Sequence, residues 1–343
     1  PTSLSETGDD SYVYFKKQAT FAVIGVAAML FISKIDYRFW KKFYKIAYIA
    51  SIILLLMVLI PGIGRSAGGA RRWINLGIQF QPSELAKIGL IIFYASYLTD
   101  HKDELKDFKK GFVKPLLYLI PVVLILILVQ DHLSATIIIV LVVGIMMLMA
   151  GVRPKYFATV GTGVAVAGAA GLYAMAKFTS KGAFRIARIT SFLNPWADKQ
   201  GDGWQVIQSL YAIGSGGLFG VGLGQSKQKY LYISEPHTDF IFAVLAEELG
   251  FVGCAIVIGL FGIFIWRGVL AAMKAPDMFG SLVAVGITSL IGLQAIINIA
   301  VVTSSMPVTG MPLPFFSYGV TSLLILLCSV GVLLNISRAG TKV

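Results

Sequence analysis

A run of mostly apolar residues without a single charge occupies positions 133–151 and reads LSATIIIVLVVGIMMLMAG. An α-helix needs about 20 such residues to cross the hydrocarbon core of a membrane. The whole chain has the same character, since 57% of its 343 residues are hydrophobic, 13% are charged and the mean hydropathy is +0.79. A soluble domain could not bury this much apolar surface. The sequence therefore predicts a membrane protein.

Apolar stretches on both sides of this run extend the pattern to nine predicted membrane spans. We expect an all-α, polytopic transmembrane helical bundle that forms a single integral membrane domain over residues 1–343. The chain starts at Pro1 without an initiator methionine, so we expect one further span before it, which would make ten. A large extracytoplasmic loop with short helices is expected at 177–238, including an amphipathic helix at 204–213. The spans are 18–34, 44–61, 83–99, 115–130, 133–151, 156–176, 240–265, 281–303 and 320–336.

The short loops between these spans carry lysines and arginines that fall consistently on one side of the membrane. Basic residues in short loops mark the cytoplasmic side, which places the 177–238 loop outside. The net charge of +12 then reflects contact with anionic lipid headgroups, and no nucleic-acid partner is expected. These loop residues are Lys34, Arg38, Lys41, Lys42, Lys102, Lys106, Lys109, Lys110, Lys114, Arg153, Lys155, Arg267, Lys274, Arg338 and Lys342.

The sequence gives no support for a disulfide framework, a zinc site or nucleotide hydrolysis. Cys254 and Cys328 lie in apolar runs with no cysteine or histidine at ligand spacing. No glycine-rich loop ending in Gly-Lys-Ser or Gly-Lys-Thr occurs. The energy for any reaction must therefore come from an activated substrate or from a gradient.

The strongest candidate for chemistry is Asp239, in the segment EPHTDFIF at 235–242. Asp239 would lie at the outer mouth of a span, where it could simply cap the helix. Partial burial there would raise its pKa and suit it to act as a general base. His237 could bind substrate through a hydrogen bond, or it could be an ordinary solvated loop histidine.

Four more carboxylate or amine groups lie at the outer half of predicted spans. Glu84 and Lys87 are three residues apart on one helical face, as either a structural ion pair or a pair that positions a polar headgroup or Asp239. Glu247 and Glu248 lie deeper in the helix after Asp239, and a hydrogen-bonded structural role is favoured for both over a role in lining the site.

Clustered arginines on the outer face predict an anionic ligand. Arg71 and Arg72 precede Trp73, a combination suited to phosphate oxygens beside a lipid or sugar, although Trp73 could also be an interfacial anchor. Arg185 and Arg188 could form a second phosphate clamp or could extend to the membrane surface.

The segment at 306–319, MPVTGMPLPFFSYG, contains three prolines and two glycines between two spans. Such residues exclude regular helix over much of the segment. Non-helical backbone at membrane depth is tolerated where it is covered by protein or lines a wet cavity. We therefore expect this segment to form a wall of the site opposite Asp239, with Ser317 as a candidate substrate-binding residue.

Six motifs occur in order along the chain: GARRWI, FQPSELAKI, RITSFLNPW, QSLYAIGSGGLFGVGLGQS, EPHTDFIFAVLAEELGF and PVTGMPLPFFSYG. Together they resemble the shape, elongation, division and sporulation (SEDS) family of peptidoglycan glycosyltransferases, which includes FtsW, RodA and SpoVE. The resemblance runs from about Tyr14 to Arg338. It implies a ten-helix fold in the bacterial cytoplasmic membrane, with an active site on the extracytoplasmic side.

The resemblance implies that the chain polymerises lipid II into glycan strands for division, elongation or sporulation, with a class B penicillin-binding transpeptidase as partner. It makes Asp239 the catalytic residue. Substrate-binding roles would fall to Arg72, Trp73, Glu84 and Lys87. A divalent cation, magnesium or manganese, is a candidate cofactor. A lipid II flippase and a non-catalytic scaffold for the transpeptidase are the alternatives.

One position departs from the family pattern. Members often have Gln-Pro-Asp-Leu-Gly-Thr where this chain has Gln-Asp-His-Leu-Ser-Ala at 130–135, so His132 replaces an aspartate. In the expected mechanism Asp239 takes the proton of the acceptor sugar's C4 hydroxyl as that oxygen attacks the donor's anomeric carbon. Undecaprenyl pyrophosphate would leave with inversion, and its charge would be held by Arg71, Arg72, Arg185 and Arg188.

Overall fold

The computed structural model describes residues 13–67, 70–75, 79–163, 192–197, 203–228 and 237–341. They fall into two compact units. The first unit comprises the described parts of Pro154–Gly262 and Gln294–Tyr318, and the second those of Tyr12–Arg153, Ile263–Leu293 and Gly319–Val343. Two of the unit boundaries fall within long helices, α11 (Ile241–Met273) and α12 (Met278–Val302).

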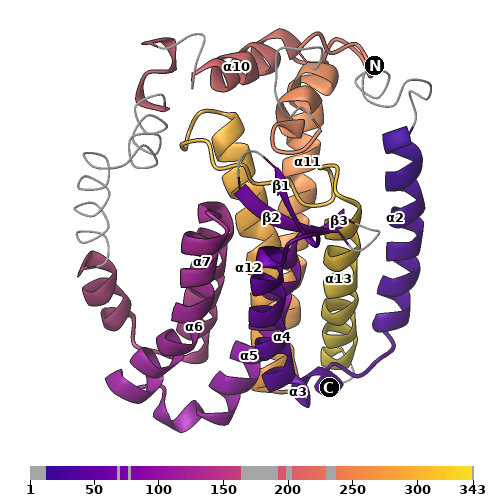
Figure 1. Ribbon diagram of the computed structural model, residues 1–343. Coiled ribbons are helices and arrows are strands. Elements are labelled where there is room, and N and C mark those ends of the chain that lie inside the picture. Colours follow the sequence, from indigo (N-terminus) through magenta and orange to yellow (C-terminus); the bar gives the residue numbers. More distant parts are fainter. Residues whose placement is uncertain are drawn as a thin grey trace. The chain divides into compact units, whose positions relative to one another are not determined.

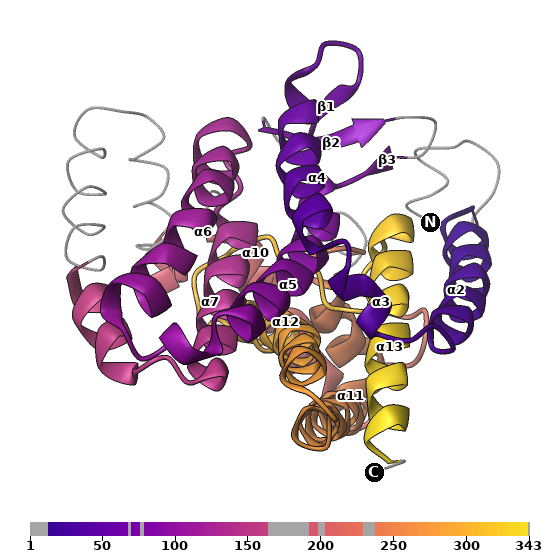
Figure 2. The same ribbon diagram turned by 90° about the horizontal axis from the view of Figure 1, so that it is seen from below.

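Helices make up most of the second unit (Figure 1). Two pairs, α2 with α13 and α4 with α5, lie side by side in both views (Figures 1 and 2). Pro121 in α6 cannot donate a backbone hydrogen bond, and the chain passes into a π-helix four residues later. The helices are α2 (Val13–Ile32), α3 (Arg38–Lys41), α4 (Tyr44–Leu56), η1 (Met57–Leu59), α5 (Pro82–Asp100), η2 (Lys102–Glu104), η3 (Phe108–Val113), α6 (Lys114–Leu124), η4 (Ile125–Val129), α7 (Leu133–Ala150) and α13 (Val320–Gly340).

The predicted class, a bundle of membrane helices, is confirmed. Among the described residues, six helical segments are long and apolar enough to cross a membrane: Phe15–Ile32, Phe108–Val129, Leu133–Ala150, Ile241–Met273, Met278–Val302 and Val320–Gly340. The predicted span 44–61 corresponds to a shorter apolar helix, Tyr44–Leu59. The predicted span 83–99 corresponds to α5, which has 19 residues, three of them charged. Span 156–176 is helical up to residue 163 and otherwise lies outside the described residues.

A small antiparallel sheet interrupts the helices of the second unit and was not predicted. Its strands are β1 (Gly64–Ala67), β2 (Ala70–Asn75) and β3 (Gln79–Phe80), in the order β1-β2-β3. Side chains alternate between the two faces of a strand. On β2 this alternation puts Arg72 on the face of the fully buried Ile74, whereas Arg71 lies on the opposite face and is exposed.

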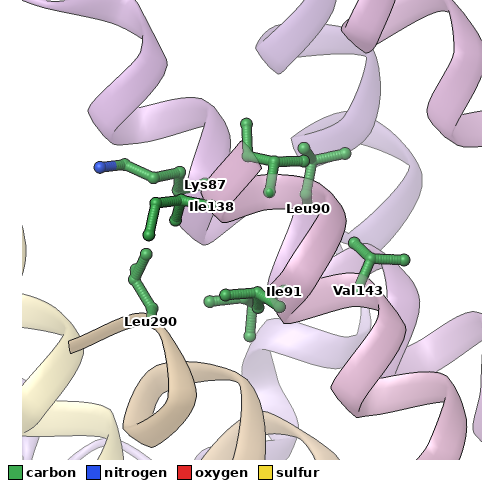
Figure 3. Close-up of a pocket in the computed structure, with 8 residues that line it drawn as sticks. Lys87, Leu90, Ile91, Ile138, Val143 and Leu290 are labelled. Carbon is green, nitrogen blue, oxygen red and sulfur yellow. The ribbon is translucent and has the colours of Figure 1, made fainter. Parts of the chain in front are cut away.

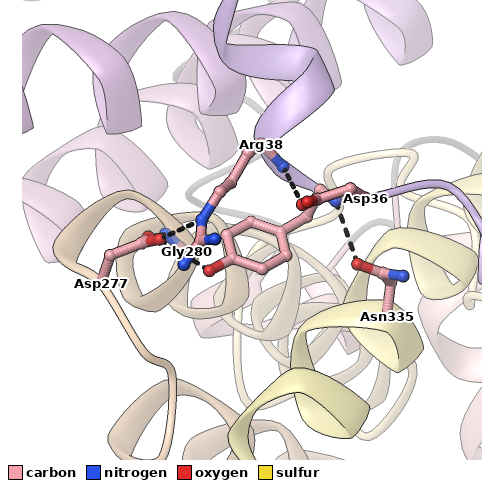
Figure 4. A network of polar contacts seen from close by, with 6 residues as sticks. Asp36, Arg38, Asp277, Gly280 and Asn335 are labelled. Atoms are coloured by element: carbon pink, nitrogen blue, oxygen red, sulfur yellow. Dashed lines mark hydrogen bonds and ion pairs between the residues drawn. The ribbon is translucent and has the colours of Figure 1, made fainter.

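One polar network ties together the ends of several helices in the second unit (Figure 4). Asp277 precedes α12 and accepts hydrogen bonds from the Gly280 amide at 2.8 Å, the Tyr37 hydroxyl at 2.7 Å and Arg38 Nε at 2.9 Å. Asn335 in α13 accepts from the Tyr37 amide at 3.0 Å. Burial and the hydrogen bond to Asp277 raise the pKa of Tyr37 to about 12, so the phenol stays protonated and keeps donating.

The first unit contains the short helix η5 (Pro195–Ala197), α10 (Trp204–Gly216) and parts of α11 and α12. The predicted amphipathic helix at 204–213 is confirmed by α10. Helix α11 is broken at Gly250, which has φ +66° and ψ −166°. That conformation is open essentially to glycine alone.

A glycine-rich segment at 217–222 supplies the hydrogen bonds that the broken helix loses. Unpaired backbone groups inside a protein cost free energy, and the two segments satisfy each other through four bonds of 2.9 to 3.1 Å. The approach is so close that a Cβ at Gly250 would lie 2.3 Å from the Gly220 nitrogen. The bonds run from Val221 N to Glu247 O, Gly222 N to Glu248 O, Phe251 N to Gly217 O and Val252 N to Leu218 O.

Replacing Gly250 with alanine should lower the free energy of unfolding by about 1–3 kcal/mol through backbone strain alone, and the steric clash should add to this loss. Thermal unfolding of the detergent-solubilised protein measures the change. Gly259→Ala is the matched control, since Gly259 lies in the same helix with nothing within 4 Å of its added Cβ. This control should leave stability equal or higher. Equal effects of the two substitutions would contradict the account of the break.

Candidate functional site

Asp239 lies in a turn that comes just before α11, which begins at Ile241. Three successive backbone carbonyls in this turn accept hydrogen bonds, and the 306–319 segment supplies two of the donors. The Tyr318 amide donates to the His237 carbonyl at 2.7 Å, and Ser317 Oγ donates to the Thr238 carbonyl at 2.6 Å. The segment predicted to form a wall near Asp239 is thus attached directly to its turn.

The third donor is Asn298, which lies inside α12 and is 1% exposed. Its Nδ2 donates to the Asp239 carbonyl at 2.8 Å and to the Met311 carbonyl at 2.6 Å. The neighbouring Gly310 has φ +65°, and a Cβ built there would lie 3.2 Å from Asp239 Oδ2. The carboxylate therefore faces loop backbone at a position where only glycine fits without strain.

Ser317 and His237 both make hydrogen bonds within the protein, in addition to any contact with a substrate. Ser317 is 8% exposed, and its hydroxyl also accepts a hydrogen bond from the Leu313 amide at 2.7 Å. His237 is half-buried, and its carbonyl is held by Tyr318. The substrate-binding roles of these two residues stay predictions, while Ser317 has a clear part in fixing the turn.

Glu247 has the structural surroundings that were favoured from the sequence. It is 2% exposed and accepts hydrogen bonds from Ser226 Oγ, from the Lys227 amide at 3.0 Å and from the Gln228 amide at 3.3 Å. The Ser226 amide lies 3.4 Å from Glu248 Oε1. These bonds fasten the 226–228 loop to α11.

In the second unit, Glu84 and Lys87 form a buried ion pair near the start of α5. Lys87 Nζ lies 2.7 Å from Glu84 Oε1, and the residues are 4% and 6% exposed. Beside Lys87 is a cavity about large enough for one water molecule, lined otherwise by apolar side chains such as Ile91, Ile138 and Leu290 (Figure 3). The pair predicted from spacing alone is present.

Arg72 holds the turn that precedes α7. Its Nε donates to the Gln130 carbonyl at 3.2 Å and its Nη2 to the Asp131 carbonyl at 2.6 Å. Asp131 has φ +47°, a strained conformation for a residue with a side chain. Gln130 is fully buried and donates from Nε2 to the Leu55 carbonyl at 2.8 Å.

His132, which replaces the family's aspartate, is a neutral member of this cluster. Burial, together with the positive charges of Arg72 and Lys87, lowers its pKa to about 3. His132 therefore adds no charge beside Arg72 and the Glu84–Lys87 pair. An aspartate at this position would have added a negative charge.

The remaining predicted residues are dispersed. Arg71 is exposed and Trp73 half-buried, and as strand neighbours Arg71 and Arg72 do not form a single clamp. Arg185 and Arg188 lie outside the described residues. Asp239 belongs to the first unit and the Arg72 cluster to the second, so a single site formed by both stays a prediction.

Asn298 and Gln130 were not among the candidate residues predicted from the sequence. The only available signal was a polar amide within or beside an apolar run.

A metal site is not formed by protein side chains alone in the described ranges. They contain no group of three or more histidine, cysteine, aspartate or glutamate residues that could hold an ion. Magnesium is often held by one or two carboxylates together with substrate phosphates. The divalent cation stays a prediction.

Lys87→Met should lower the free energy of unfolding by about 3 kcal/mol or more, because it leaves Glu84 buried without its partner. The double variant Glu84→Gln/Lys87→Met should recover most of that loss, since no charge is then left unpaired. Unfolding of both variants in the same detergent measures the coupling. Additive losses would show that the two groups do not stabilise each other.

Comparison with known proteins gives consistent matches along the chain. The family model described as "Cell cycle protein", for FtsW, RodA and SpoVE, matches residues 1–342. Stage V sporulation protein E of Bacillus subtilis is 47% identical over 96% of this chain and 88% of its own length. A probable peptidoglycan glycosyltransferase FtsW of Geobacter sp. (strain M18) is 44% identical over 96% of this chain and 88% of its own.

Solved structures give the same result. A chain from a peptidoglycan synthase complex that coordinates polymerization and crosslinking is 29% identical, with a TM-score of 0.81 over 97% of this chain and 92% of that one. The rod shape determining protein RodA of Thermus thermophilus is also 29% identical, with a TM-score of 0.68 over 98% of this chain and 91% of that one. This multi-pass membrane protein therefore belongs to the SEDS family of FtsW, RodA and SpoVE.

Proposed function

We propose that this chain is a peptidoglycan glycosyltransferase that polymerises lipid II into glycan strands. The observation that carries the proposal is the fixed turn at Asp239, which holds one carboxylate against loop backbone in a protein of this family. Relatives 40–44% identical to it bear the name probable peptidoglycan glycosyltransferase FtsW.

Asp239 acts as the general base. It accepts the proton of the acceptor sugar's C4 hydroxyl while that oxygen forms a bond to the anomeric carbon of the donor. The bond between the anomeric carbon and the phosphate oxygen breaks, and the undecaprenyl diphosphate leaves with the electron pair. A base held in place before the reaction needs no reorganisation during it.

The leaving diphosphate is stabilised by positive charge. The guanidinium of Arg72, next to a neutral His132, supports this role for the second unit. Arg71, with its exposed guanidinium, and Arg185 and Arg188 are further candidates. A divalent cation bound to the diphosphate would add to the same effect.

The enzyme acts at the outer face of the bacterial cytoplasmic membrane, with a class B penicillin-binding transpeptidase as partner. The one-sided distribution of lysine and arginine in the short loops supports this orientation. The likeness to a chain from a synthase complex that coordinates polymerization and crosslinking supports the partnership.

Asp239→Asn should abolish glycan synthesis while the protein still folds and inserts, because the amide cannot accept the proton. The assay incubates the purified protein and its transpeptidase with labelled lipid II and separates the glycan products. Asp103→Asn, which changes an exposed carboxylate in η2, is the control and should keep full activity. Polymer formation by Asp239→Asn would refute the assignment. Lipid II translocation without polymer would instead favour a flippase.

A further inference from the structure

We infer that Asn298 is a positioning residue for the Asp239 carboxylate, acting through its two amide hydrogens; this inference rests on the proposed function. Asn298 sits within the long helix α12 and is 1% exposed. A side chain locked by packing inside a helix is a more rigid support than one on a loop. The hydrogen bond from Asn298 therefore holds the Asp239 turn in a fixed position relative to α12.

The amide of Asn298 joins the two pieces of backbone that define the surroundings of the carboxylate. One hydrogen goes to the carbonyl of Asp239 itself, at 2.8 Å. The other goes to the carbonyl of Met311, at 2.6 Å, directly after the glycine that faces Asp239 Oδ2. Asn298 thus sets both the backbone that carries the carboxylate and the backbone that lies opposite to it.

Only the observed orientation of the amide makes these bonds. Both acceptors are carbonyl oxygens, so a flipped amide would point its own oxygen at them. In the observed orientation the Oδ1 atom is buried without a hydrogen-bond partner. An unpaired buried acceptor costs free energy, and the two bonds that Nδ2 donates offset that cost.

Ser317 acts on the adjacent peptide. Its hydroxyl donates to the Thr238 carbonyl at 2.6 Å and accepts from the Leu313 amide at 2.7 Å. With two successive carbonyls held by side chains, the direction in which the Asp239 side chain leaves the backbone is restricted. Asn298 is the stronger of the two supports because it fixes Asp239 itself.

The test is Asn298→Asp, which keeps the shape of the side chain and removes the two hydrogens. We expect kcat for lipid II polymerisation to fall about 10- to 100-fold, as small misplacements of a catalytic group do, while KM changes less than about twofold. Gln294→Met is the matched control, because Gln294 lies one turn earlier on α12, is 3% exposed and has an amide oxygen without a partner. This control should keep kcat near that of the wild type.

A double-mutant cycle separates positioning from general structural support. Asp239→Glu moves the carboxylate, so Asn298→Asp should reduce kcat much less in that background than in the wild type. Fully multiplicative effects would overturn the inference. If Asn298→Asp does not fold, Ser317→Ala replaces it in the same cycle, with the same expectation and the same contrary outcome.

Failure of this inference differs from failure of the proposed function. An inactive Asp239→Asn combined with wild-type kcat in Asn298→Asp would overturn only the positioning role. An active Asp239→Asn would overturn the proposed function and the inference with it. A loss of kcat in Asn298→Asp that disappears in the Asp239→Glu background supports both.

Discussion

The pairing of backbone amides and carbonyls wherever a helix is interrupted is the constraint on which the rest of this structure depends. Every departure from helix must find partners for its amides and carbonyls. At Gly250 the broken helix pairs with the 217–222 segment, and at the turn before α7 the guanidinium of Arg72 covers two carbonyls. At 237–239 the donors come from the 306–319 segment and from Asn298. Asp239 and the carbonyls bound by Arg72 both lie at such departures.

Buried charged side chains likewise need partners. Glu84 has Lys87, and Glu247 has the donors of residues 226–228. His132 stays neutral because its surroundings are buried and already positive. The guanidinium of Arg72 is half-buried, and a positive charge in such surroundings attracts an anion more strongly than the same charge in water would.

Sequence patterns predicted the features that depend on composition and spacing. The apolar runs predicted the helices, the i, i+3 spacing predicted the Glu84–Lys87 pair, and the prolines at 306–319 predicted a non-helical segment beside Asp239. The small sheet was missed because its strands are only two to six residues long and are joined by segments of two and three residues. Asn298 was missed because nothing local in an apolar helix reveals which distant carbonyl an amide will contact.

The kind of bond that holds each carboxylate bears on which one does chemistry. A general base changes its charge in every catalytic cycle. Glu84 is held by an ion pair, so its protonation would release Lys87 and leave an unpaired charge. The three bonds at 237–239 engage only backbone carbonyls, and none of them depends on the charge of the Asp239 side chain. These three bonds therefore remain possible in either protonation state of Asp239, whereas the ion pair of Glu84 with Lys87 does not.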